Sequence, residues 1–159
     1  QDLRIYIATG IGYQSSVNTQ VIDFELSDQT DFPPIDNMLN FDLEAMVFAF
    51  DSLYLFTRNR TSPFNGITKM YSLPADPGVH IAQLRDSFFG NLSSNFSSIT
   101  GADISTENGT LALLTKGSVF FFPDFFQTIL IEQHRHIKDV FRCKRKIPTK
   151  LLQRRGGCH

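Results

Sequence analysis

The stretch from Phe41 to Arg60, FDLEAMVFAFDSLYLFTRNR, constrains the fold of this chain more than any other. Two apolar runs, 45–50 and 53–56, flank the dipeptide Asp51-Ser52. Both runs are rich in aromatic residues, and each is too short for a helix that buries its own apolar stripe. The stretch therefore predicts a β-hairpin, with functional side chains at its polar ends.

Similar short runs recur on both sides of this hairpin. Turn residues separate them, including Asn65-Gly66 and Lys116-Gly117, and the paired prolines 33 and 34 mark 27–40 as a loop. The four runs from 43 to 88 predict an up-and-down antiparallel meander. The other strands predicted by this pattern are 3–9, 19–26, 99–105, 110–115 and 118–122, and the last two strands within the meander are 67–73 and 79–88.

The segment 99–117 repeats the order of the hairpin, because ITGADIS-TENG-TLALLTKG aligns with LEAMVFAF-DS-LYLFTRN. A repeat of about 50 residues, built from four short antiparallel strands, is typical of a β-propeller blade. One blade cannot bury both of its faces, so neighbouring blades stabilise it. We predict an all-β fold, a partial β-propeller of about two and a half four-stranded antiparallel blades over residues 1–126. Closure of the repeats as a sandwich is the alternative.

The predicted blades divide the body unequally. Residues 3–26 form the outer part of one blade, about 42–88 a whole blade, and 99–122 most of a third. A closed propeller needs about four blades or more. The chain starts at Gln1 and not at Met, which fits a mature secreted protein or a fragment.

Charge separates this body from the last 33 residues. Residues 1–126 carry 6 basic and 14 acidic residues, a net charge of −8, whereas 127–159 carry 9 and 2, a net charge of +7. An acidic body repels phosphate backbones, so we expect no nucleic-acid binding by the body. The basic tail, 127–159, is expected to be helical or disordered, and only this tail suggests binding to nucleic acid or anionic lipid. No apolar run approaches the roughly 18 residues of a membrane span.

Three carboxylates form the candidate metal site. Asp42 and Glu44 are two residues apart, so on a strand both side chains face the same way, and Asp103 opens the third predicted blade. Adjacent carboxylates repel unless a cation neutralises them, and hard oxygen ligands suit Ca²⁺. The alternative is that Asp42 and Glu44 pair with Arg58 or Arg60 from the neighbouring strand, and that Asp103 serves a turn.

Polar residues at the end of the hairpin form the candidate ligand-binding site. Arg58, Asn59 and Arg60 follow the second strand, and arginines bind carboxylates or phosphates through paired hydrogen bonds. The alternative is a solvated strand end with ion pairs. Sequons for N-glycosylation begin at Asn59, Asn91, Asn95 and Asn108 and mark surface loops in a eukaryotic secreted protein.

The segments FPP, FDLEAM, LYLFTRNR, SLPADPG and TGADIS, taken in order, resemble the secreted β-propeller proteins of Bacteroidetes, many known only as hypothetical or type IX secretion-associated proteins. The resemblance covers about residues 1–126. It extends more distantly to the SdiA-regulated and esterase-like phytase propellers. It implies a propeller of the six-bladed type, secreted, periplasmic or on the cell surface, with acidic residues near the central channel and frequent calcium association. The chain departs from that pattern in its missing blades and its basic tail.

These features lead to a binding or scaffold module outside the cytoplasm as the predicted function, with an unknown ligand or surface partner and calcium at the acidic strand starts. The alternative is a metal-dependent hydrolase of the phosphoesterase kind. In that case Asp42, Glu44 and Asp103 hold the metal, and Arg58 or Arg60 binds the anionic substrate. No G-x-S-x-G, H-E-x-x-H or Gly-rich phosphate loop occurs, so the sequence favours the module over the enzyme.

Overall fold

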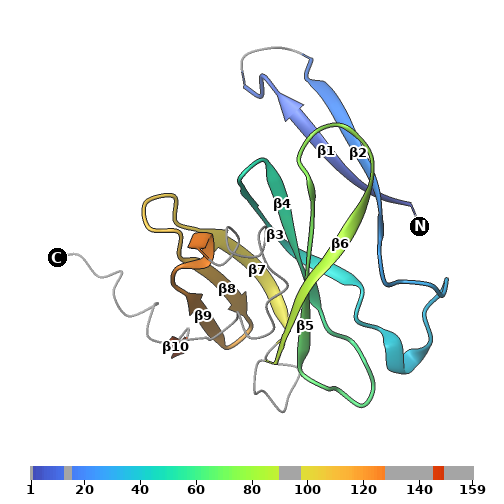
Figure 1. Cartoon of the computed structure of the whole chain (residues 1–159), viewed down its shortest axis with the longest axis vertical. Coiled ribbons are helices and arrows are strands. Elements are labelled where there is room, and N and C mark those ends of the chain that lie inside the picture. The colour runs from blue at the N-terminus through green and yellow to red at the C-terminus, as the bar shows by residue number, and fades with distance from the viewer. Residues whose placement is uncertain (1, 13–15, 90–97, 128–144, 149–159) are drawn as a thin grey trace.

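The computed structural model of this chain describes residues 2–12, 16–89, 98–127 and 145–148 and contains two β-sheets whose strands pair mostly antiparallel (Figure 1). The first sheet has the strand order β1-β2-β6-β5-β4-β3, and the second has the order β10-β9-β8-β7. The all-β prediction is therefore confirmed. The strands are β1 (Leu3–Thr9), β2 (Asn18–Leu26), β3 (Asp42–Ala49), β4 (Ser52–Arg58), β5 (Ile67–Pro74), β6 (Gly78–Phe89), β7 (Ile99–Ile104), β8 (Leu111–Thr115), β9 (Ser118–Phe122) and β10 (Arg145–Pro148), and a 3-10 turn spans Asp36–Met38.

The central hairpin is present, but its turn lies one residue earlier than predicted. Ala49 pairs with Ser52, and Phe50 and Asp51 between them have φ angles of 49° and 55°. Positive φ at both central residues suits the right-handed twist of the flanking strands, although it is unusual for a phenylalanine. The Phe50 ring meets the Phe126 ring edge to face, with centroids 4.9 Å apart. This contact with the segment that follows β9 helps to hold Phe50 in the turn.

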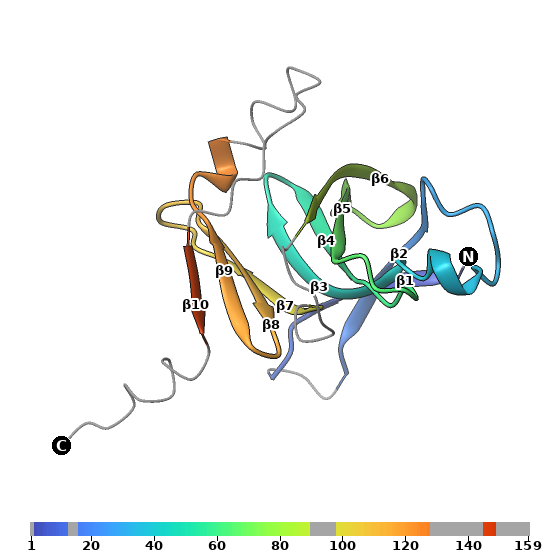
Figure 2. The ribbon, with the colours of Figure 1, turned by 90° about the horizontal axis from the view of Figure 1, so that it is seen from below.

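The N-terminal hairpin β1-β2 belongs to the first sheet. β2 pairs in parallel with β6, in the register that sets Ile22 opposite Gly78. The sequence placed 3–26 in a separate blade, whereas here it extends the meander β3–β6 to six strands. The sheet curls into a half-barrel with β1 and β3 as its two terminal strands (Figure 2).

Two apolar cores hold the strands together. One lies inside the half-barrel, where β1 and β2 cover the concave face of β4 and β5; its buried members are Ile22, Phe24, Leu26, Leu53, Leu55, Tyr71, Leu73 and Ala82. The other lies between the two sheets and includes Ala45, Val47, Tyr54, Phe56, Met70, Ile99, Leu111, Leu113, Phe120, Phe122 and Phe125. The second sheet therefore covers the convex face of β3, β4 and β5.

The second sheet repeats the register of the meander. We call β3–β6 unit 1 and β7–β10 unit 2. The β3–β4 ladder shifts between Leu43 and Ala45, and the β7–β8 ladder shifts between Ile99 and Gly101. Glu44 and Thr100 are thus the extra residues of corresponding β-bulges. Each bulge follows a pair with a buried threonine, Leu43 with Thr57 and Ile99 with Thr115.

This register fixes which residues share a face, because directly paired residues point to the same side of a sheet. We call the concave side of unit 1 its front and the side against unit 2 its back. One row of paired residues points to the front in each unit: Met46, Leu55 and Tyr71 in unit 1, and Ala102, Leu113 and Phe120 in unit 2. The neighbouring row points to the back: Val47, Tyr54 and Ser72 in unit 1, and Asp103, Ala112 and Phe121 in unit 2. The back of unit 1 therefore packs on the front of unit 2.

Most of the predicted basic tail, 127–159, lies outside the described residues. Within it, Arg145–Pro148 form β10, which pairs antiparallel with β9 and supplies the fourth strand of unit 2. This strand was not predicted, because its run of basic residues lacks apolar alternation.

The loop between β2 and β3 is tied to the core by a polar cluster. The Tyr71 hydroxyl, in a fully buried side chain, donates to Asp28 over 2.8 Å, and the Lys69 ammonium lies 2.7 Å from the same carboxylate. That ammonium also lies 3.9 Å from the centroid of the Phe41 ring. Burial and the bond to Asp28 raise the pKa of Tyr71 well above its ordinary value.

This shift predicts a loss of stability in alkali that depends on Tyr71. The unfolded tyrosine ionises near pH 10 while the folded one keeps its proton, so its contribution is complete below about pH 10 and declines above it. The free energy of unfolding should fall by up to about 1.4 kcal/mol more per pH unit in the native chain than in Tyr71→Phe. Urea unfolding at successive pH values measures this difference. Tyr6→Phe, at an exposed tyrosine, should keep the native pH dependence; equal slopes in all three proteins contradict the assignment.

Candidate functional site

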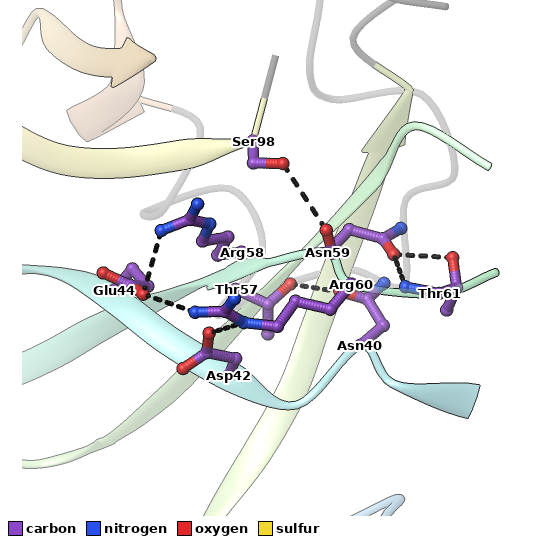
Figure 3. Close-up of polar contacts among 9 residues, drawn as sticks. All are labelled: Asn40, Asp42, Glu44, Thr57, Arg58, Asn59, Arg60, Thr61 and Ser98. Carbon is purple, nitrogen blue, oxygen red and sulfur yellow. Dashed lines mark hydrogen bonds and ion pairs between the residues drawn. The ribbon is translucent and has the colours of Figure 1, made fainter. Parts of the chain in front are cut away.

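Four charged side chains meet where β3 begins and β4 ends (Figure 3). Glu44 Oε1 accepts from Arg58 Nη1 over 3.4 Å and from Arg60 Nη2 over 3.3 Å. Arg60 Nε donates to Asp42 Oδ2. We call these four residues the arginine ladder. Its two carboxylates and two guanidinium groups balance in charge.

Local strand geometry explains the ladder. Asp42 lies directly opposite Arg58, and the bulge inserts Glu44 as an extra residue within reach of both arginines. The Arg60 backbone N–H donates to Leu39 O over 2.9 Å, which fixes the chain just beyond β4. The hydrogen bond with Asp42 raises the pKa of Arg60 above its ordinary value. The carboxylates thus have the arginine partners that the sequence offered as the alternative to a metal.

Asn59, predicted to bind ligand beside the arginines, is 3% exposed. Its Nδ2 donates to Asn65 Oδ1 and to Ile67 O, the latter over 2.7 Å, and its Oδ1 accepts from the Thr61 backbone and hydroxyl over 2.8 and 2.7 Å. Ser98 of unit 2 donates to the Asn59 carbonyl over 3.4 Å. Asn59 therefore organises the loop after β4, and only Arg58 and Arg60 of the three predicted residues present polar groups toward solvent.

An apolar gutter runs beside the ladder. We use this name for a hollow of about 350 Å³ between β1 and β3, lined by Leu3, Arg4, Ile5, Phe24, Leu43, Glu44, Ala45, Met46 and Leu55. A neighbouring hollow of about 290 Å³ shares Leu3 and reaches Asp42, Phe41 and Arg60. The ladder thus forms part of the rim, while the floor is the core of the half-barrel. β1 and β3 are the end strands of their sheet in the described part of the chain.

Asp103 lies away from the ladder. Its side chain accepts from the Ile104 backbone N–H over 2.8 Å and lines a separate hollow of about 340 Å³ on the back of unit 2. By register Asp103 corresponds to Val47, while Thr100 corresponds to Glu44. Across the described ranges, no three His, Cys, Asp or Glu side chains gather as a metal-binding group. The calcium site at Asp42, Glu44 and Asp103 stays a prediction.

The gutter was not predicted from the sequence. Its signal is the alternation of Leu3, Ile5 and Ile7 along β1, which predicts one apolar face but not the strand opposite. That strand, β3, approaches β1 only because β2 pairs with β6.

No protein-family model, curated protein or solved structure matches the chain. The site must therefore be interpreted from its own geometry. Among the described residues, none of the helices has the length and apolarity that a membrane crossing requires. Of the four sequons, Asn91 and Asn95 lie outside the described residues, Asn59 is buried and Asn108 is exposed.

Removal of the Asn59 side chain should destabilise the fold without touching the gutter. Asn59→Ala leaves the Thr61 backbone N–H without its side-chain acceptor and removes one of the two amide donors to Ile67 O, the other being Asn40 Nδ2 at 3.1 Å, at a cost of about 1–3 kcal/mol. The matched control is Asn108→Ala, because exposed Asn108 accepts from the Thr110 backbone N–H over 3.0 Å, two residues ahead as in Asn59 and Thr61, but from an exposed position. Chemical unfolding of both variants measures the difference. Equal losses at the two positions show that the buried network is not the cause.

Proposed function

We propose that this chain is a binding module of the extracytoplasmic kind, built from propeller-type units, and that the gutter between β1 and β3 binds an extended apolar segment of a partner protein. The observation that carries the proposal is the gutter itself: an apolar hollow bounded by two end strands. Ligand sites are commonly concave and mostly apolar, with a few polar groups that fix orientation.

The end strands favour an extended ligand. An end strand presents unpaired backbone N–H and C=O groups, and a peptide in β conformation satisfies them as an added strand. Alternate side chains of such a peptide point to one side, toward Leu3, Ile5 and Met46. The opposite rims carry charged groups that are already ion-paired, Arg4 with Asp2 and Asp23 on one side and Glu44 with the two arginines on the other.

Repetition supports a propeller-type architecture for the module. Corresponding residues of units 1 and 2 are paired in the same way across their strands, and a bulge occupies the same place in both. They also stack back to front, as successive blades do. Such stacking gives a binding surface a rigid support. Secretion to the periplasm, the cell surface or the medium follows from the sequence resemblance and is tested by cell fractionation.

Calcium at the ladder belongs to the same proposal. Because the arginines neutralise Asp42 and Glu44, a cation must compete with Arg60, the partner of both carboxylates. Hard oxygen ligands at the ladder suit calcium once that guanidinium moves away.

Peptide display tests the gutter. The native chain should enrich extended apolar peptides, and Met46→Lys should weaken binding of the selected peptides by about tenfold or more, because a charge replaces apolar contact. Val79→Lys is the control, since Val79 is 84% exposed on β6 and does not line the gutter. Affinities by fluorescence titration decide the matter. If no peptide is enriched, or if both lysine variants bind alike, the gutter is not the recognition surface.

Thermal unfolding tests calcium. Millimolar calcium should raise the melting temperature of Arg60→Ala more than that of the native chain, because Asp42 and Glu44 lose their shared competitor. Glu44→Gln in the same background should abolish the increase. Magnesium, which prefers a stricter octahedral geometry, is the control ion. The same response in all variants rules out calcium at the ladder.

A further inference from the structure

In the described part of the chain, the β3 portion of the unit 1 front and the back of unit 2 have no sheet packed on them. On the front of unit 1, the hairpin β1-β2 covers β4 and β5, but Met46 and Phe48 on β3 are 46% and 58% exposed. On the back of unit 2, Leu114 is 41% exposed and Asp103 lines the hollow of about 340 Å³. Within one molecule, a back and a front are already buried against each other, because the back of unit 1 packs on the front of unit 2.

We infer that a second copy of this chain docks its unit 1 front on the unit 2 back of the first, head to tail. The inference rests on the propeller-type repeat of the proposed function. It sets a front against a back, as the contact between unit 1 and unit 2 does, but on the unit 1 side only β3 takes part, because β1-β2 covers β4 and β5. Ile104 on the front of unit 2 packs into the core against unit 1, and the residue that corresponds to Ile104 is Phe48. Phe48 of the second copy would make the same kind of contact with unit 2.

The receiving face has room for this ring. In unit 1 the back row contains Tyr54, whose ring meets Phe125 at 5.7 Å between centroids. Unit 2 has Ala112 at that position, and the missing aromatic side chain leaves the hollow that Ala112 and Phe121 line. The hollow has mixed lining, with Asp103, Ser105, Asn108 and Thr110 beside the apolar Ile104, Ala112 and Phe121. Burial of the exposed Phe48 ring against Ala112 and Phe121 is favourable.

Asp103 limits the strength of this contact. It stands where unit 1 has the buried Val47, so docking must desolvate a carboxylate whose bond in this structure is to its neighbouring backbone N–H. The native association is therefore expected to be concentration-dependent and reversible. A head-to-tail contact either closes into a ring or continues as a chain of copies.

Sedimentation velocity across a concentration series tests the inference. Asp103→Val, which restores the unit 1 residue, should tighten self-association by about tenfold or more. Phe48→Glu and Leu114→Glu should each stay monomeric, because each destroys one of the two faces. Val79→Glu, outside both faces, should associate like the native chain. Circular dichroism and reversibility on dilution check that Asp103→Val and the glutamate variants are folded and that the gain is not aggregation of misfolded chains.

Mixing the two glutamate variants gives the sharper result. Phe48→Glu retains an intact unit 2 back, and Leu114→Glu retains Phe48, so the mixture should form a dimer of one copy of each and nothing larger. Monomers in the mixture, or no added association in Asp103→Val, overturn the inference. So does association of either glutamate variant alone, which indicates a face-to-face contact. Peptide binding by monomeric Phe48→Glu then shows separately whether the gutter functions.

Discussion

Burial between stacked sheets is the interaction on which this structure depends. A short antiparallel sheet has two faces, and unit 1 becomes stable only because the half-barrel core covers its front and unit 2 covers its back. Large side chains such as Phe56, Met70 and Phe122 lie in the contact between sheets. At about 25 cal/mol per Å² of apolar surface, burial of this kind far exceeds the contribution of any exposed ion pair in the molecule. The positions of the gutter and of the ladder follow from this packing, since both lie on strands that the core holds rigid.

Electrostatics has a different role, because it shapes the site without supporting the fold. The arginine ladder is partly exposed, and its charges cancel, so its energetic contribution is small while its geometric effect is large. It keeps two neighbouring carboxylates from repelling each other at the start of β3. The Asp28 cluster, by contrast, lies against the buried Tyr71 and joins a proline-containing loop to the core. The polar groups near the core thus hold the loop between β2 and β3 in place, and the polar groups at the rim set the charge that the surface presents to a partner.

Sequence patterns predicted most strands because they are local. Period-two alternation and turn dipeptides predicted the nine strands between Leu3 and Phe122 to within three residues. Two pairings could not be predicted, namely β2 with β6 and β10 with β9, because each joins segments far apart in sequence with no local marker. The predicted carboxylate trio divides between two surfaces. Because the bulge occupies the same place in both units, Thr100 corresponds to Glu44, and Asp103 corresponds to the back-facing Val47. Pairing of Asp42 and Glu44 with the arginines, by contrast, was available from the hairpin alone.

The burial of Asn59 has a consequence for how the protein can be made. Its side-chain amide, together with the Thr61 hydroxyl, is the chemical group that oligosaccharide transfer uses in an N-x-T sequence, and both are enclosed in the folded loop. In a eukaryotic secretory host, transfer during synthesis would precede this enclosure. A sugar chain attached there has no space in the native packing, so the choice of expression host determines whether newly made chains reach the same fold.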